Sequence, residues 1–314
     1  MSAMSSVALG ISAVLLLMAA ISLAGARWVE HEVPPLGHFI EVEGVRLHYV
    51  EAGVGPTVIL LHGASANLRD MASSLMGPLS QHHRVIAFDR PGYGYSERPD
   101  RDWPNPARLA DLVITAAERL GAERPVLVGH SWSGSVVMAG LLTQGARLRG
   151  GVLLSGVAGH WAGSVGWTYD VGGLPVIGPL FAHTLVFPAG MVLMPGMVQA
   201  VTAPNPVPPR YLNHIGARLA LRPRTFRHNV TDMSRLNEYM QSLSTRYARI
   251  DRPLLVIHGE ADELVPFWNH GQRLQAVVRD VQFSLIPDAG HAPHHTHTDA
   301  VVSAVETFAA SLER

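Results

Sequence analysis

The 314-residue chain has the composition of a globular protein with a large apolar core, because 47% of its residues are hydrophobic and 16% are charged. Its formal net charge of -1 gives no electrostatic reason to bind a polyanion, so we expect no nucleic-acid partner. The sequence contains no cysteine, which excludes disulfides, thiolate metal sites and a cysteine nucleophile. All 24 basic residues are arginines, so a Schiff base on a lysine is excluded as well.

The amino terminus carries an apolar segment typical of targeting. No charged side chain precedes Arg27, and residues 7–23 are nearly all aliphatic, in a run long enough to cross a bilayer as a helix. The small residues Ala24, Gly25 and Ala26 resemble a signal-peptidase site, but no basic residue precedes the apolar run. We expect residues 1–26 to anchor the protein in a membrane; a cleaved signal of an exported protein and a buried N-terminal helix are the alternatives.

The following residues predict a β-hairpin, in which segments 39–42 and 45–50 alternate apolar and polar side chains around Glu43-Gly44. Short apolar runs, typical of strands buried on both faces, then recur at residues 57–61, 85–88, 125–128, 151–154, 254–258 and 282–286. Helical patterns lie between or after several of these strands, at residues 107–120, 131–142 and 299–312. Strands that alternate with helices predict an α/β fold with a mostly parallel, doubly wound sheet.

One segment, residues 157–247, interrupts this alternation. It shows no convincing buried strand and instead contains apolar helical pieces at 176–185 and 191–201, followed by a proline-rich joint at 203–209. We therefore expect a helical lid that is inserted into the α/β core. The core is then made of residues 27–156 and 248–314.

A serine lies between a predicted strand and a predicted helix, in the run Gly129-His130-Ser131-Trp132-Ser133-Gly134. Such a turn is tight, so the residues two before and two after the serine should be small, and its strain lifts the hydroxyl above the edge of the sheet. The helix that follows directs its positive N-terminal end at the same place, which favours developing negative charge. Ser133 stands where the usual G-x-S-x-G pattern has its second glycine, and we expect the turn to tolerate it.

A serine hydroxyl becomes a nucleophile when a base takes its proton and an acid orients that base. His291 follows the last predicted strand, and Asp262 follows the strand before it. Glu260 and Glu263 are the competing acids, but the short side chain of Asp262 leaves the strand end after a tight turn. We therefore expect Ser131, His291 and Asp262 to form a catalytic triad at the carboxyl edge of the sheet.

The backbone N–H groups of Ala64 and Trp132 are the candidates for an oxyanion site. Ala64 follows the first central strand, where the flexible Gly63 lets its N–H turn toward the nucleophile, and Trp132 directly follows Ser131. Two such donors supply roughly 3 kcal/mol each to a transition state. We expect His62 to support this loop rather than to react.

Three further histidines follow His291, at His294, His295 and His297. Packing in the core or at the surface is the ordinary role of such residues. Their loop offers no acidic or thiolate ligand at regular spacing, so we expect neither a metal ion nor a cofactor.

Together, five ordered motifs resemble those of the α/β-hydrolase fold superfamily, and specifically its lidded branch of serine esterases, lipases and carbon–carbon bond hydrolases. The motifs are His62-Gly63-Ala64, the run from Asp89 to Pro99, Gly129-His130-Ser131-Trp132, Gly259-x-x-Asp262-x-x-Val265-Pro266 and Gly290-His291-x-Pro293. The resemblance extends from about residue 39 to the C terminus, except for the lid. It implies the triad and oxyanion residues named above and no cofactor.

Serine at position 131 narrows the reactions that this resemblance implies. Haloalkane dehalogenase and epoxide hydrolase relatives use an aspartate there, so a serine implies acyl transfer to water. We expect a carboxylesterase acting on a small ester with a hydrophobic portion, because the predicted lid is unusually apolar, at Leu180, Phe181, Leu185, Phe187, Met191, Leu193, Met194 and Met197. Packing within the lid is the other explanation for these residues. A carbon–carbon bond hydrolase of ring-cleavage products and a non-catalytic hydrolase-like binding protein are the alternative functions.

Overall fold

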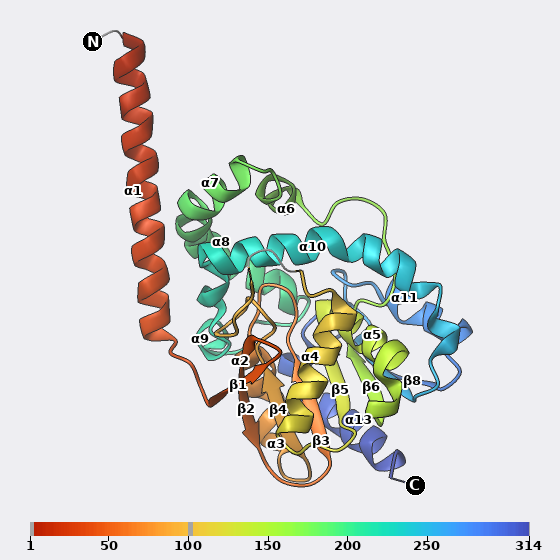
Figure 1. Ribbon diagram of the computed structural model, residues 1–314. Helices are drawn as coiled ribbons and strands as arrows, with labels where there is room; N and C mark the ends of the chain where they lie inside the picture. Colours follow the sequence, from red (N-terminus) through yellow and green to blue (C-terminus); the bar gives the residue numbers. More distant parts are fainter. Residues whose placement is uncertain (1–2, 100–102, 314) are drawn as a thin grey trace.

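The computed structural model describes residues 3–99 and 103–313, and an eight-stranded sheet lies at its centre (Figure 1). The strands are β1 (His38–Val42), β2 (Val45–Ala52), β3 (Thr57–Leu61), β4 (Arg84–Phe88), β5 (Val126–His130), β6 (Gly150–Leu154), β7 (Leu254–Gly259) and β8 (Val281–Ile286). Their order across the sheet is β1-β2-β4-β3-β5-β6-β7-β8. β1 and β2 form the predicted hairpin and β2 runs antiparallel to β4, whereas the other neighbours are parallel. The predicted fold class is confirmed.

Helices cover both faces of this sheet (Figure 1). One face packs against α4 (Pro106–Arg119) and α5 (Gly134–Gln144), and the other against α2 (Leu68–Met71), α3 (Gly77–Leu79) and α13 (Thr298–Ser311). Alternate residues of a strand point to opposite faces. In β3, Ile59 and Leu61 therefore join the first apolar layer, while Val58 and Leu60 join the second. This burial on both faces explains why the strand reads as a continuous apolar run.

The chain begins with α1 (Ala3–Glu32), a helix that extends away from the rest of the molecule (Figure 1). At 1.5 Å per residue it is about 45 Å long, and it is long and apolar enough to cross a membrane. Its C-terminal part packs against the body of the protein, where Val29 is fully buried and the Ser22 hydroxyl donates to the Thr184 carbonyl at 3.3 Å. The apolar helix was predicted for residues 1–26; it continues to Glu32, and residues 1–2 lie outside the described part.

The residues between β6 and β7, all of which the structure describes, form helices and loops without a strand. We call residues 157–247 the insert; its helices are α6 (Trp167–Gly172), α7 (Ile177–Thr184), α8 (Val186–Thr202), α9 (Tyr211–His214) and α10 (Pro223–Ser244). α7 and α8 correspond to the two predicted pieces, although α8 begins earlier, at Val186, and continues through Pro195. α7 and α8 meet at 68°, and the two helices together, but neither alone, are long and apolar enough to cross a membrane.

The longest helix of the insert, α10, is absent from the sequence prediction. It lies across the same end of the sheet as the loops that follow the parallel strands (Figure 1). Its buried face combines apolar residues such as Leu236 and Met240 with the polar residues Asn229 and Asp232. A helix is recognised in a sequence by the periodicity of its apolar residues. In α10 this periodicity is interrupted, because several of its buried positions are occupied by polar side chains.

Two short helices follow the last two strands. α11 (Phe267–His270) comes after β7, and α12 (Pro293–Thr296) comes after β8 and directly precedes α13. Both therefore belong to the loops at the carboxyl edge of the parallel strands.

The start of α5 presses against the loop that follows β6, and Gly134 makes this contact possible. A Cβ atom at Gly134 would lie 2.6 Å from both the Cα of Gly156 and the backbone nitrogen of Val157. We predict that Gly134→Ala lowers the free energy of unfolding by about 1–3 kcal/mol, because backbone atoms cannot rotate out of the way. Denaturant unfolding of the purified protein measures this change.

Gly196→Ala is the matched control for that experiment. Gly196 lies on the exposed side of α8, where a Cβ would meet nothing within 4 Å. The substitution should raise the free energy of unfolding by about 0.5–1 kcal/mol, since alanine loses less conformational entropy than glycine in a helix. Equal effects of the two substitutions would contradict the tight packing at Gly134.

Candidate active site

Ser131 lies in a sharp turn between β5 and α5. It begins the 3-10 turn η2 (Ser131–Ser133), and its φ of +53° places it in the left-handed region. A residue other than glycine in this region costs on the order of 1–3 kcal/mol, which the surrounding packing must offset. Part of that restraint is a hydrogen bond of 2.9 Å from the Val157 N–H to the Ser131 carbonyl. The side chain is half-buried at the carboxyl edge of the sheet.

The structure brings the three predicted triad residues together. His291 Nε2 lies 2.9 Å from Ser131 Oγ, and His291 Nδ1 lies 2.8 Å from Asp262 Oδ2. Because a carboxylate can only accept, the Nδ1–H of His291 donates to Asp262, which leaves Nε2 able to accept the proton of Ser131. Asp262 and His291 follow β7 and β8, so two neighbouring strand ends supply the two partners. The competing acids Glu260 and Glu263 are exposed to solvent.

Hydrogen bonds fix the Asp262 carboxylate. Oδ1 accepts from the backbone N–H groups of Leu264 at 3.0 Å and Val265 at 2.9 Å. Burial alone would raise the pKa of Asp262, but the electrostatic interaction with His291 and hydrogen bonds from His258, His291 and Val265 outweigh it and hold this pKa well below its ordinary value. Burial lowers the pKa of His291, and Asp262 opposes that shift. The arrangement therefore combines an ionised acid with a neutral base.

The loop after β3 lies directly against the serine. A Cβ on Gly63 would come within 2.9 Å of the Ser131 Cβ and 3.4 Å of its Oγ, so only glycine fits there. This contact brings the loop that contains Ala64 beside Ser131, as the sequence analysis expected. Trp132 is the second residue of η2, and an N–H at the start of a helical turn has no partner within that turn. Both N–H groups therefore belong to backbone segments adjoining the Ser131 hydroxyl.

Ser133 makes a hydrogen bond that the sequence did not indicate. Its side chain is fully buried, and its hydroxyl donates to the backbone carbonyl of His62 at 2.5 Å. The hydroxyl therefore ties the turn at Ser131 to the loop before Ala64. The tightest glycine requirements fall instead on Gly129, where a Cβ would lie 2.3 Å from the Ser133 carbonyl oxygen, and on Gly134. Ser133 thus occupies the second glycine position of the motif without a clash.

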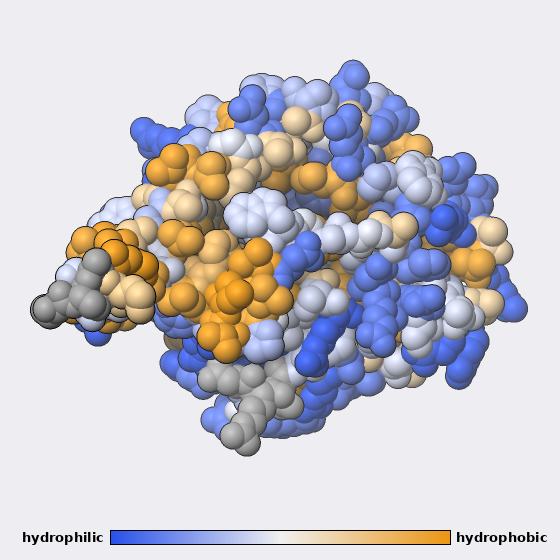
Figure 2. Space-filling view, turned by 90° about the horizontal axis from the view of Figure 1, so that it is seen from above, coloured by the Kyte–Doolittle hydropathy of each residue, from blue (hydrophilic) through white to orange (hydrophobic). Residues whose placement is uncertain are grey.

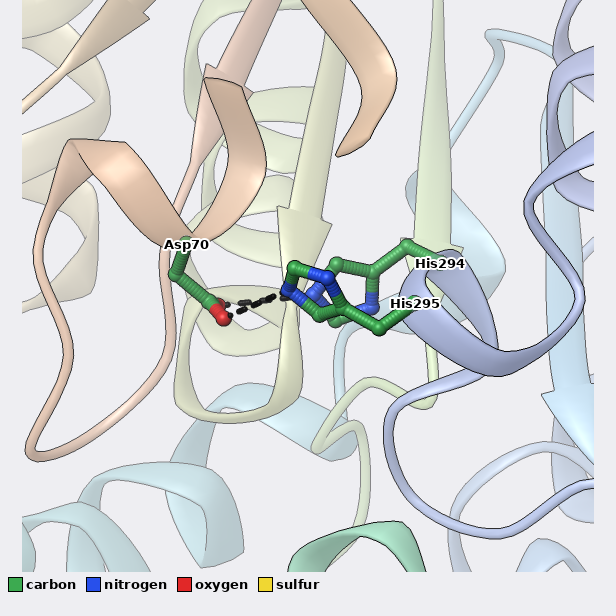
Figure 3. A group of neighbouring side chains, drawn as sticks. All are labelled: Asp70, His294 and His295. Carbon is green, nitrogen blue, oxygen red and sulfur yellow. Dashed lines mark hydrogen bonds and ion pairs between the residues drawn. The ribbon is translucent and has the colours of Figure 1, made fainter. Parts of the chain in front are cut away.

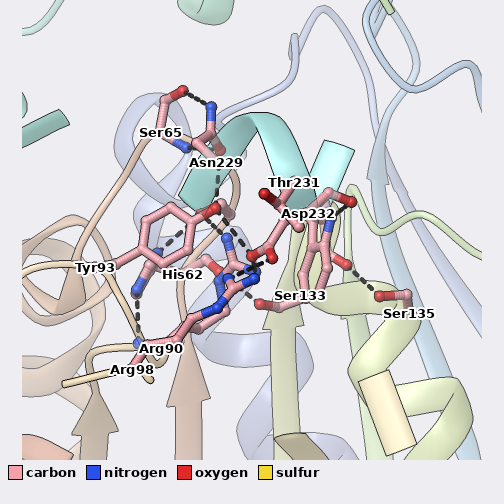
Figure 4. A network of polar contacts seen from close by, with 12 residues as sticks. His62, Ser65, Arg90, Tyr93, Arg98, Ser133, Ser135, Asn229, Thr231 and Asp232 are labelled. Carbon is pink, nitrogen blue, oxygen red and sulfur yellow. Dashed lines mark hydrogen bonds and ion pairs between the residues drawn. The ribbon is translucent and has the colours of Figure 1, made fainter. Parts of the chain in front are cut away.

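A buried ionic cluster, which sequence reasoning missed, lies beneath this loop (Figure 4). Its centre is Asp232 of α10, whose carboxylate is 2.7 Å from Arg98 Nη1, 3.3 Å from Arg90 Nη1 and 3.0 Å from the Tyr93 hydroxyl. The indole N–H of Trp132 donates to the Asp232 carbonyl at 3.3 Å. Arginine and tyrosine occur in the motif from Asp89 to Pro99, but nothing in the sequence indicates their partner more than 130 residues later.

Arg90 and His62 connect this cluster to the loop after β3. Arg90 Nη2 donates to the Gly63 carbonyl at 3.1 Å, and its guanidinium lies 4.0 Å from the centre of the Trp132 ring. His62 Nε2 accepts from the Arg90 N–H at 3.0 Å, and Nδ1 donates to the Gly63 carbonyl at 2.8 Å. Burial and the charge of Arg90 lower the pKa of His62 to about 4, so its ring is neutral. Both nitrogens of His62 are engaged in supporting the loop.

The insert adds a further contact through Asn229 of α10. Its Oδ1 accepts from the Ser65 N–H at 3.1 Å, and its Nδ2 donates to the Ser65 hydroxyl at 2.8 Å (Figure 4). Because Ser65 follows Ala64, the insert holds the same loop from its other end.

The fold agrees with comparisons to known proteins. Residues 58–304 match the model of the Alpha/beta hydrolase family, and the chain belongs to this family. It is 25% identical to a putative non-heme chloroperoxidase of Synechocystis over 82% of this chain and 92% of that protein. It is 26% identical to a 2-hydroxymuconate semialdehyde hydrolase of Pseudomonas putida over 89% of this chain and 96% of that protein.

A crystal structure of a membrane phospholipase A, described as a bacterial virulence factor, is also similar. Its TM-score is 0.71, its sequence identity 18%, and the match covers 98% of this chain and 97% of that chain. At this identity the likeness shows the fold alone.

The buried cluster around Asp232 generates a prediction about stability. Asp232→Asn leaves two buried guanidinium groups without their counter-charge, so we predict a loss of about 3–5 kcal/mol in the free energy of unfolding. Glu97→Gln, which breaks the exposed pair with Arg46, should change it by at most about 1 kcal/mol. Denaturant titration of both variants provides the measurement, and similar midpoints would show that the cluster contributes little.

Proposed function

We propose that this protein is a serine hydrolase of carboxylic esters, with Ser131 as nucleophile, His291 as general base and Asp262 as the acid that orients it. The observation that carries the proposal is the continuous hydrogen-bonded relay from Ser131 Oγ through His291 to Asp262, with contacts of 2.9 and 2.8 Å. A relay of this kind deprotonates a hydroxyl that is otherwise a poor nucleophile.

In the first half of the reaction, Ser131 Oγ attacks the ester carbonyl carbon while its proton passes to His291 Nε2. The N–H groups of Ala64 and Trp132 stabilise the resulting oxyanion, and Asp262 stabilises the imidazolium. His291 then returns the proton to the departing alcohol, which leaves an acyl group on Ser131. In the second half, His291 takes a proton from water, the hydroxide attacks the acyl carbon, and the acid leaves as the proton returns to Ser131 Oγ.

The insert and α1 favour an ester that is taken from a membrane surface. Apolar side chains are exposed along the insert, at Trp167, Leu174, Val176, Ile177, Leu180, Leu185, Val192, Leu193 and Met197. Figure 2 shows hydrophobic residues gathered on the face of the molecule from which α1 projects. Exposed apolar surface of this extent favours contact with a lipid phase. The membrane phospholipase A with the same fold agrees with this proposal.

Two pairs stand out among the eight apolar residues singled out in the sequence. Phe187 and Met194 are buried in a cluster that includes Val29 of α1. Leu193 and Met197 are exposed on α8. The first pair joins α1 to the insert, and we propose that the second contacts lipid while the insert covers the active site as a lid.

A second reaction has specific support. The relative from Pseudomonas putida is named as a 2-hydroxymuconate semialdehyde hydrolase, and it aligns over 89% of this chain. Cleavage of a carbon–carbon bond in a ring-cleavage product is therefore the alternative to ester hydrolysis.

The role of Ser131 is tested with p-nitrophenyl esters of increasing chain length. We predict that Ser131→Ala lowers kcat on the order of 10³-fold or more, because no other group then supplies the attacking oxygen. Ser242→Ala, on the exposed side of α10, should leave kcat unchanged. Equal turnover by wild type and Ser131→Ala would end the proposal. A ring-cleavage dienoate hydrolysed far faster than any ester would favour the carbon–carbon hydrolase.

The membrane-surface substrate is tested with charges on the exposed face of α8. We predict that the double substitution Leu193→Glu and Met197→Glu lowers kcat/KM for an ester held in phospholipid vesicles on the order of tenfold, since carboxylates resist contact with lipid. The rate on a short water-soluble ester should not change. Val54→Glu, an equally apolar and exposed position between β2 and β3, is the control. Equal losses with both kinds of ester would point to a folding defect and against lipid contact.

A further inference from the structure

A cluster of one carboxylate and three imidazoles lies beside Ser131 and takes no part in the relay. Asp70 comes from α2, and His294 and His295 belong to α12 (Figure 3). His130 is the last residue of β5. Asp70, His130 and His294 are almost fully buried, and the side chain of His295 is 8% exposed. Three segments that are remote in the sequence thus place these groups in one buried cluster.

The distances around Asp70 match those of a metal site. His295 Nε2 lies 3.0 Å from Oδ1 of Asp70, and His294 Nε2 lies 3.4 Å from Oδ2. The candidate ligand atoms of the three residues all lie within 4.8 Å of one another. A tetrahedral zinc ion with bonds of about 2.0–2.1 Å holds neighbouring ligand atoms roughly 3.3 Å apart. The nitrogen–oxygen separations here lie on either side of that value.

Several nitrogens of the cluster are buried without a hydrogen-bond partner. They are Nδ1 of His130 and both ring nitrogens of His294. Leaving one buried polar atom unpaired costs about 1–3 kcal/mol. Two of these atoms, His130 Nδ1 and His294 Nε2, lie 3.6 and 3.4 Å from the same carboxylate oxygen of Asp70, which indicates a site whose groups are arranged for a cation rather than for one another.

The hydrogen bond of His130 strengthens this argument. His130 Nε2 lies 3.0 Å from the backbone carbonyl of His291, so Nε2 carries the proton and donates. In the neutral ring Nδ1 then has a bare lone pair, and this nitrogen is 3.6 Å from Oδ2 of Asp70. Two acceptors at this distance repel each other unless a positive charge lies between them. Histidines that face a metal ion commonly donate their other N–H to a backbone carbonyl, as His130 does.

We propose that Asp70, His294 and His295 bind a divalent transition-metal ion, for which zinc is the best match, and that Nδ1 of His130 faces the same ion. Imidazole nitrogens combined with one carboxylate oxygen suit zinc, whereas calcium and magnesium prefer oxygen ligands. The sequence analysis expected no metal because the loop of His294 and His295 lacks an acidic ligand. Asp70 supplies it from 225 positions earlier in the chain.

The ion joins three segments that carry the proposed catalytic groups. α2 follows the loop of Ala64, His130 immediately precedes Ser131, and α12 begins two residues after His291. Among the described residues, no hydrogen bond joins the three proposed ligands to Ser131, and we infer that the site positions these segments rather than reacting with substrate. This inference concerns metal binding and does not depend on the identity of the ester.

The experiment uses the full-length protein in detergent, stripped with a chelator, reloaded with Zn²⁺ and freed of excess metal. Elemental analysis should find about one zinc per chain, and reloading should raise Tm, since a ligand that binds the folded state stabilises it. Asp70→Asn and His294→Gln should each weaken zinc binding more than about 100-fold, because losing a ligand exceeds the 10–100-fold effect of losing an outer partner. Cobalt in place of zinc should give the visible absorption of a four-coordinate site in wild type but not in these two variants.

His297→Gln is the matched control. His297 belongs to the same run of histidines, but its Nδ1 contacts the Thr296 hydroxyl instead of Asp70, so this variant should keep its zinc. Circular dichroism checks that each variant is folded. If Asp70→Asn or His294→Gln does not fold, His295→Gln replaces it, because the side chain of His295 is the most exposed of the three ligands. Less than about 0.1 zinc per reloaded wild-type chain, or retention of zinc by the folded ligand variants, overturns the proposal.

Discussion

The sharp turn after β5 is the constraint on which the site depends. Ser131 is held at a φ of +53° while the backbone of Gly63 approaches it without a side chain, and Gly134 lets the start of α5 pack against the loop after β6. The backbone therefore sets where the side chain of Ser131 begins, and the contact with His291 Nε2 orients its Oγ. His291 and Asp262 lie near Ser131 because they follow two neighbouring strands that end at the same edge of the sheet. The backbone N–H groups of Leu264 and Val265 hold the Asp262 carboxylate in place.

The insert is part of this construction, because α10 supplies polar groups to the core. Asp232 neutralises Arg90 and Arg98, and Arg90 in turn donates to the carbonyl of Gly63. Asn229 holds the same loop at Ser65. A helix whose buried face is largely polar gains less from the hydrophobic effect, but each of its polar groups specifies one partner. The loop beside Ser131 therefore depends on a helix that comes more than 150 residues later.

Local signals in the sequence predicted the sheet and the three triad positions, since each follows a short apolar run at a strand end. The motif placed Ser131 because a strand-to-helix turn has its own residue requirements. Polar residues whose partners lie far away in the sequence gave no such local signal. Asp232 and Asp70 look like ordinary acidic residues in the sequence, and only the packing of α10 and α2 gives them buried histidine or arginine neighbours. The same limit hid α10, whose buried polar face breaks the apolar periodicity.

The junction between α1 and the insert has a mechanical consequence. Val29 and Phe187 lie in one apolar cluster, and a Cβ on Gly25 would overlap the Phe187 ring, so α1 cannot turn independently of α8. A membrane-spanning helix adjusts to bilayer thickness by tilting. With α1 embedded in lipid, a thinner or thicker bilayer would transmit its tilt as a torque to the helices above Ser131. If the proposed function holds, lipid composition would thereby affect the site at Ser131 as a force as well as through the supply of ester.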